Sequence, residues 1–133
     1  MSPESPGEWY SYAVVRVVPR VEREEFVNVG VVLFAPVSGL LCARATLDGE
    51  RIRALDREAD LGDIEAHLRL YQDICEGNPA SGPIAELPAS ERFHWLTAPR
   101  STVIQTSQVH EGWTTDLDVT FEQLFDRYVT GSE

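Results

Sequence analysis

The sequence predicts an α+β fold, in which two to four helices pack on a small, mostly antiparallel sheet of about four strands. Three β-rich runs follow one another near the N-terminus with short connections, and this order favours an antiparallel meander. A long amphipathic helical pattern with a cap at each end follows them. The length of 133 residues suits a single core, so we expect one domain over residues 9–130 after a flexible segment, 1–8.

The first two strands are predicted over residues 9–18 and 26–34, where β-branched and aromatic residues predominate. Pro19 ends the first strand, and Asn28 and Gly30 interrupt the second. Such an interruption is typical of a β-bulge or of a close backbone approach. It serves local packing or shapes a ligand site, and Asn28 is therefore an additional candidate site residue.

The remaining strands are predicted over residues 40–47, after a turn signal at 35–39, and over residues 101–107. The segment 78–88 contains three prolines and one glycine and is expected to be a loop.

The most regular helical pattern covers residues 61–75. Asp60 can cap its N-terminus, and Asp63 places a negative charge in the first turn, where the helix dipole favours one. Gly77 stands where a left-handed residue is expected after the helix.

Shorter helical segments are expected elsewhere. Residues 50–57 predict a helical turn, and residues 91–98 predict a short helix that Pro99 ends. The run from Thr120 to Gln123 fits a capping box for a C-terminal helix. A helix pair on one face of the sheet would bury the apolar stripes of the long helix and of this C-terminal helix.

The chain is strongly acidic, with 22 Asp and Glu against 11 basic residues and a net charge of −11. All the basic residues are arginines, which excludes Schiff-base chemistry on a lysine. An acidic body repels a phosphate backbone, so we expect no general nucleic-acid binding, whereas a basic partner remains compatible. No apolar run is long enough to span a membrane and no signal peptide is recognised, so we expect a cytoplasmic protein.

The stretch RSTVIQTSQVH at residues 100–110 combines an arginine with hydroxyls, amides and a histidine. A guanidinium next to hydroxyl groups suits a phosphate or carboxylate, since each oxygen accepts a charge-assisted hydrogen bond. The alternative is that the arginine pairs with an internal acid and the hydroxyls bond along the sheet. The candidate anion-site residues are Arg100, Ser101, Thr102, Gln105 and His110.

Arg16 and Arg44 each interrupt an apolar strand, where an unpaired charge is costly. Glu22, Glu24 and Glu25 in the connection between the first two strands are the expected partners. The alternative is that both arginines join Arg100 in one cationic patch, so they are additional candidate site residues.

Other chemistries lack a motif. The three histidines are widely spaced and form no metal-ligand pattern, and no nucleophile or phosphate-loop motif occurs, so no metal or cofactor is expected. Cys42 and Cys75 are expected to be buried thiols, with a redox pair or a metal ligand as the alternatives. The three tryptophans are expected in the core or at its rim. The alternative for Trp113, which lies in a predicted loop, is an exposed position in which it contacts a partner.

Two stretches resemble the bacterial family catalogued as domain of unknown function 3037: EFVNVGVVLF at residues 25–34 and RFHWLTAPRSTVIQTSQVH at residues 92–110. The resemblance extends from Tyr10 to about Tyr128. The family has no established activity, so the resemblance implies no catalytic residues. Its members are often encoded beside HipA-like kinases, and the resemblance therefore implies such a kinase as a partner.

The leading functional hypothesis is a non-enzymatic protein-interaction or regulatory module whose acidic surface meets a protein partner. It rests on the lack of catalytic motifs, on the acidity and on the partner that the resemblance implies. One alternative is a small enzyme or sensor that binds an anionic metabolite at Arg100, Ser101 and Thr102. The other is an acidic nucleic-acid mimic. The sequence leaves the oligomeric state open.

Overall fold

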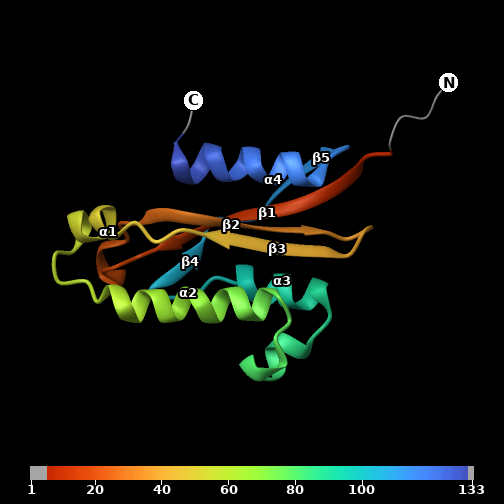
Figure 1. Ribbon diagram of the computed structural model, residues 1–133. Coiled ribbons are helices and arrows are strands. Elements are labelled where there is room, and N and C mark those ends of the chain that lie inside the picture. Colours follow the sequence, from red (N-terminus) through yellow and green to blue (C-terminus); the bar gives the residue numbers. More distant parts are fainter. Residues whose placement is uncertain (1–5, 132–133) are drawn as a thin grey trace.

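A computed structural model describes residues 6–131, and within this range five strands form one antiparallel sheet. The sheet order is β3-β2-β1-β4, and β5 pairs with β1 beside β4 (Figure 1). The predicted α+β class and the N-terminal meander are confirmed. The elements are β1 (Glu8–Val17), β2 (Val27–Ala35), β3 (Leu40–Ala45), α1 (Gly49–Leu55), α2 (Leu61–Cys75), α3 (Ala89–Thr97), β4 (Ile104–Thr106), β5 (His110–Thr114) and α4 (Leu117–Phe125).

Helices cover both faces of the sheet, with α2 and α3 below and α4 above in the view of Figure 1. The expectation that the two apolar helices pack on one face was therefore wrong. The cause lies in β2, whose Val31 and Leu33 pack against α4 while Val29 and Val32 pack against α2 and α3. A central strand that is apolar on both faces needs a covering layer on each of them.

The bulge predicted in β2 is present. Val15 pairs with Gly30 and Arg16 pairs with Asn28, so Val29 is the extra residue of β2. Gly30 also marks a close approach, because a Cβ atom there would lie 2.3 Å from the backbone oxygen of Arg44 on β3. The bulge and the close backbone approach, which the sequence pattern predicted as alternatives, are thus both present.

The caps of α2 agree with the sequence pattern, and those of α4 differ from it. The Asp60 side chain accepts a hydrogen bond from the amide of Asp63, and Gly77 has a φ of 75°. The predicted capping box at Thr120 was wrong, because the N-cap of α4 is Asp116, four residues earlier, whose side chain accepts a hydrogen bond from the amide of Val119. Asp116 is as good an N-cap as threonine, and Leu117 extends the apolar stripe.

The predicted fourth strand is shorter than expected, and a fifth strand follows it. Ser107 interrupts the edge: its amide donates to the carbonyl of Val14, and its hydroxyl accepts from the amide of Val14, both at 2.9 Å. Beyond it, residues 110–114 pair with β1, although the run around Gly112 reads as a loop. Gly112 fits a strand here because the Tyr10 ring occupies the space where a Cβ would lie.

Of the predicted flexible segment 1–8, residues 1–5 lie outside the described residues, and β1 already begins at Glu8. None of the helices between residues 6 and 131 combines the length and the apolar content that crossing a membrane requires.

Candidate functional site

Arg100 lies in the connection between α3 and β4, where it is held by Trp95. One guanidinium nitrogen donates to the Trp95 carbonyl, and Cζ lies 4.2 Å from the centre of the Trp95 ring. Arg100 forms no ion pair with another described residue. It shares a cavity of about 320 Å³ with Thr102 and His67, on the α2 side of the sheet.

Ser101 and Gln105 point to a different place. Gln105 on β4 lies opposite Arg16 on β1, and directly opposed residues of an antiparallel pair share a face. Ser101, Gln105 and Arg16 together line a second cavity, of about 380 Å³. The alternation of side chains along the segment thus separates Ser101 and Gln105 from Arg100 and Thr102.

Arg16 is the least satisfied of the predicted site residues. Its Cζ lies 4.0 Å from the centre of the Phe26 ring, and its Nε is buried without a hydrogen-bond partner. Burial lowers the pKa of its guanidinium below the ordinary arginine value. A protonated guanidinium carries five N–H donors, so Arg16 presents donors that the described residues do not use.

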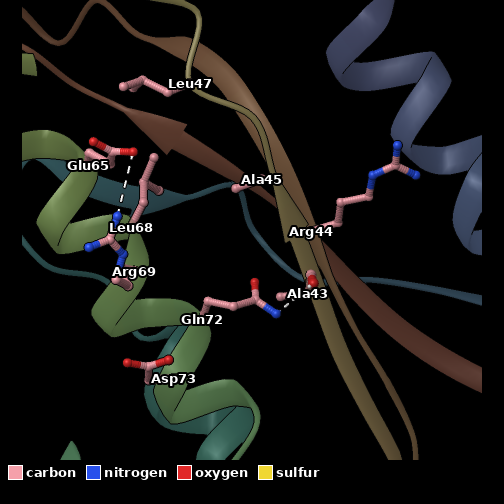
Figure 2. A pocket seen from close by; sticks show the side chains of 9 residues that line it. All are labelled: Ala43, Arg44, Ala45, Leu47, Glu65, Leu68, Arg69, Gln72 and Asp73. Carbon is pink, nitrogen blue, oxygen red and sulfur yellow. Dashed lines mark hydrogen bonds and ion pairs between the residues drawn. The ribbon is translucent and has the colours of Figure 1, made fainter.

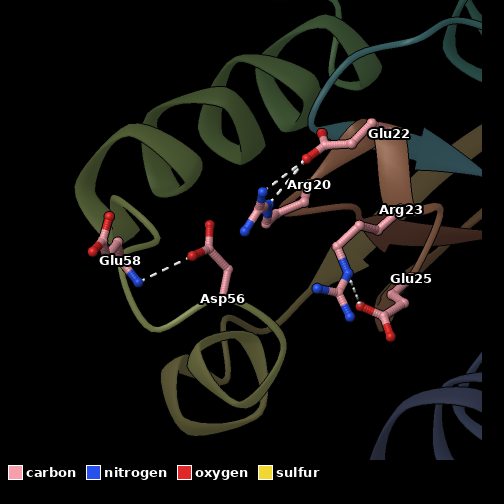
Figure 3. A network of polar contacts seen from close by, with 6 residues as sticks. All are labelled: Arg20, Glu22, Arg23, Glu25, Asp56 and Glu58. Carbon is pink, nitrogen blue, oxygen red and sulfur yellow. Dashed lines mark hydrogen bonds and ion pairs between the residues drawn. The ribbon is translucent and has the colours of Figure 1, made fainter.

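None of the three acids expected to neutralise Arg16 forms an ion pair with it, so that prediction was wrong. Figure 3 shows Glu22 paired with Arg20 and Glu25 paired with Arg23, each at 3.0 Å. The two residues of each pair are two positions apart in the sequence, so each pair forms within the segment that connects β1 and β2. Glu24 forms no ion pair with any residue from 6 to 131, although it lines the Arg16 cavity.

Asn28 is the neighbour of Arg16 across the β1–β2 pair. Its side-chain Nδ2 donates to the carbonyl of Tyr128 at 3.1 Å, in the turn of π-helix Asp126–Thr130 that follows α4. Its Oδ1 is buried and has no hydrogen-bond partner. Arg16, Asn28 and Gln105 therefore form a polar row across three strands, on the face that α4 covers.

Arg44 is neutralised by α4. Its Nη1 lies 2.9 and 3.0 Å from the two carboxylate oxygens of Glu122, and its Cζ lies 4.2 Å from the centre of the Phe125 ring. The expectation of an internal ion pair is confirmed for this arginine, but the partner is not one of the three predicted acids. Figure 2 shows its side chain pointing away from α2 and toward α4.

His110 lies on β5 against Tyr12, with 5.3 Å between the ring centres. The Tyr12 hydroxyl is 3.1 Å from that of Tyr128, and burial together with this hydrogen bond raises the pKa of Tyr12 to about 12. His110 is therefore on the α4 face, whereas Arg100 is on the α2 face. The eight candidate residues do not converge on one cleft, and they occupy four places.

The family model described as "Protein of unknown function (DUF3037)" matches residues 12–129 of the sequence. The chain belongs to this family. No curated protein and no solved structure matches the sequence significantly.

This DUF3037 domain also carries a surface that the sequence pattern did not identify. Trp9 on β1 and Trp113 on β5 are paired directly across the two strands, and they are 62% and 54% exposed. The expectation of core or rim positions was thus wrong for Trp9 and Trp113, and the exposed position named as the alternative for Trp113 is the one observed. The alternation of β1 places Trp9 on the face opposite to the buried Tyr12, but only the unrecognised strand β5 places Trp113 directly across from Trp9.

The cysteines of the DUF3037 domain are free, with Cys75 buried and Cys42 partly buried. Burial raises the pKa of Cys42 to about 11 and that of Cys75 to about 12, so neither thiol is activated. Among residues 6–131, no group of three or more His, Cys, Asp and Glu side chains is arranged to hold a metal ion.

Proposed function

We propose that the domain is a non-enzymatic protein-interaction module whose binding face is the Trp9–Trp113 pair and the adjoining edge of β5. The observation that carries the proposal is the exposure of both indoles at directly opposed positions. Tryptophan is the residue most enriched among those that dominate binding energy at protein interfaces. Two exposed indoles at opposed positions of a rigid sheet offer a large apolar area with little conformational entropy to lose.

The edge of β5 supports the same proposal. Within the described residues β5 pairs only with β1, so its outer backbone groups remain available for an added strand. On the opposite edge of the sheet, Gln72 of α2 donates its side-chain amide to the carbonyl of Ala43 on β3 at 3.0 Å, so one backbone acceptor of that edge is already used (Figure 2). The β5 edge is therefore the better place for strand addition.

The charge of the chain supports a basic partner. Glu111 is exposed and lies on the same side of β5 as Trp113, and the net charge of the chain is −11. Arginine or lysine side chains of an extended segment can stack on an indole face and pair with this carboxylate. A HipA-like kinase, which the family resemblance implies, is the first partner to examine, and a regulatory role would follow from its binding.

The test measures the affinity of a purified partner by calorimetry. Protein retained by the immobilised domain from the native host at low salt is identified, purified and titrated with wild type and with a Trp9→Ser/Trp113→Ser double variant. We expect the double variant to bind at least about tenfold more weakly, because the variant removes the interface anchors.

The matched control is Val37→Ser, since Val37 is 82% exposed on the turn between β2 and β3. It should bind as wild type does. Equal affinities for the wild type and the double tryptophan variant would contradict the proposal. So would the combined result that the purified HipA-like kinase does not bind the domain and that the domain retains no protein from the host lysate.

A second candidate function is the binding of an anionic metabolite on the other face of the sheet. It is supported by Arg100, which has no carboxylate partner and shares its cavity with Thr102 and His67. A thermal-shift screen with nucleotides and phosphorylated metabolites should then show a stabilisation that Arg100→Ala abolishes. The third hypothesis, nucleic-acid mimicry, predicts that the domain displaces DNA from a basic protein.

A further inference from the structure

The cavity around Arg16 lies at the opposite end of β1 from Trp9, seven positions along the strand. At about 3.3 Å per residue this separates the two places by roughly 23 Å. The proposed protein-binding face therefore leaves this cavity unexplained. Its lining residues are Val18, Val21, Phe26, Ser101, Gln105, Arg16 and Glu24.

Arg16 is arranged to receive a carboxylate. Phe26 supports the flat side of its guanidinium, with 4.0 Å between Cζ and the ring centre, and the terminal N–H groups of Arg16 donate to no described residue. No described residue accepts a hydrogen bond from Arg16 or pairs with its charge. A planar guanidinium held in this way binds a carboxylate through two parallel hydrogen bonds.

Glu24 supplies the opposite charge in the same cavity. Of the non-glycine residues in the described range, it alone has a positive φ, 60°, which closes the short 3-10 turn Val21–Arg23. Its neighbours Glu22 and Glu25 are paired, and Glu24 is not. A non-glycine residue in this conformation is uncommon.

The two charges share one cavity without forming an ion pair with each other. An anion alone would meet the Glu24 carboxylate and the net charge of −11, and a cation alone would meet Arg16. A ligand that carries both charges and no net charge satisfies each of them. The volume of about 380 Å³ falls within the range of roughly 300–1,000 Å³ that is usual for small-molecule sites.

We propose that this cavity binds a free α-amino acid with an apolar side chain, in its zwitterionic form. Its carboxylate pairs with Arg16 and its ammonium group with Glu24. Ser101 and Gln105 offer further hydrogen bonds, and the apolar side chain contacts Val18 and Val21. A longer peptide is excluded, because its two charged ends are separated by the chain between them.

The test titrates the wild-type protein with L-leucine and L-valine by calorimetry, next to leucinamide, N-acetyl-leucine and 4-methylpentanoate. Leucinamide lacks the carboxylate, and the other two lack the ammonium group. We expect saturable binding of at least one of the two amino acids, with a Kd of about 1 mM or below, and at least about tenfold weaker binding of all three analogues.

Two variants test the residues, Arg16→Gln and Glu24→Gln, and each should weaken amino-acid binding at least about tenfold. Arg57→Gln and Glu58→Gln are the matched controls, because both residues are exposed in the loop between α1 and α2. They should bind as wild type does. Circular dichroism establishes that each variant is folded, and the analogue series on the wild type decides the matter if Arg16→Gln is not.

Three results would overturn the proposal. The first is no binding of either amino acid at about 10 mM. The second is binding of N-acetyl-leucine or 4-methylpentanoate as tight as that of leucine, which would show a simple anion site. The third is unchanged affinity in both folded site variants. None of these results bears on the tryptophan face, which is tested by its own partner.

Discussion

Arg16 combines a full charge with partial burial and no neutralising acid, and this combination has a cost in stability. Its buried Nε lacks an acceptor, and burial lowers the pKa of the guanidinium. A buried donor without a partner costs about 1–3 kcal/mol. Arg16 follows the apolar residues Ala13, Val14 and Val15 near the end of β1, and a destabilising residue in such a place is typical of a position whose functional requirements oppose those of stability.

We therefore expect Arg16→Met to stabilise the protein by about 1 kcal/mol, because methionine keeps the apolar stem over Phe26 and removes the unpaired charge. The measurement is the free energy of unfolding from urea titration. Arg44→Met is the control and should be neutral or slightly destabilising, since it breaks the exposed pair with Glu122. A loss of stability in Arg16→Met that exceeds the loss in Arg44→Met would contradict this expectation.

At the residue scale, the sequence predicted which residues of the site are unusual, but it did not predict their partners. The sequence identified Arg16, Arg44 and Asn28 as unusual, because each interrupts an apolar strand. It did not identify their partners, since Glu122 contacts Arg44 across 78 positions of the chain. Local spacing contains no information about such a contact, so the nearest acids in sequence were chosen wrongly.

At the scale of the elements, the bulge in β2 decides the fit between β2 and β3. Gly30→Ala should destabilise the protein by about 3 kcal/mol, because the new Cβ would lie 2.3 Å from the backbone oxygen of Arg44. Backbone on both sides of the contact leaves little room for relaxation. The measurement is the urea midpoint at an unchanged slope.

Gly62→Ala is the matched control within α2, where the nearest atom to a new Cβ is an Asp60 oxygen at an ordinary 3.5 Å. It should raise stability by about 0.5–1 kcal/mol through the lower entropy of the unfolded chain. If Gly30→Ala were as stable as Gly62→Ala, that result would contradict the close approach of the Gly30 backbone to the Arg44 carbonyl on β3.

Elements with strong local signals were predictable, and those that depend on distant contacts were not. The α2 helix is specified by its own caps and apolar stripe, and the meander by three β-branched runs. β5 has neither signal, because it contains a glycine and only one large apolar residue, and it is a strand by virtue of its pairing with β1. The missed tryptophan pair follows directly from the missed strand.

At the scale of the whole molecule, the two-sided burial of the sheet was the main feature that the sequence pattern did not resolve. The apolar stripe of α4 predicts that this helix packs on the sheet, but the same stripe would fit either face of the sheet. The choice is made by β2, whose bulge moves Val29 and Val32 to one face and Val31 to the other.

This two-sided core makes the protein sensitive to alkali. Burial raises the pKa of Cys42 to about 11, that of Cys75 to about 12 and that of Tyr12 to about 12. The unfolded chain releases these protons at lower pH than the folded chain does, so the unfolded state is favoured as pH rises. We expect the free energy of unfolding to fall from about pH 9 to about pH 12.

The measurement is urea unfolding at a series of pH values. Tyr12→Phe removes one of the titrating groups and should make the fall above pH 10.0, the ordinary tyrosine pKa, less steep. A free energy of unfolding that stays constant between pH 9 and pH 12 would contradict the burial of these groups.

The most direct test of the proposed interaction face is hydrogen–deuterium exchange of the domain with and without its purified partner. Addition of a strand to β5 should slow exchange of the backbone amides in residues 110–114, and little protection should appear on β3, where Gln72 already bonds the Ala43 carbonyl. Protection confined to α2 and α3, with β5 exchanging as in the free domain, would contradict the proposal that the Trp9–Trp113 face binds the partner.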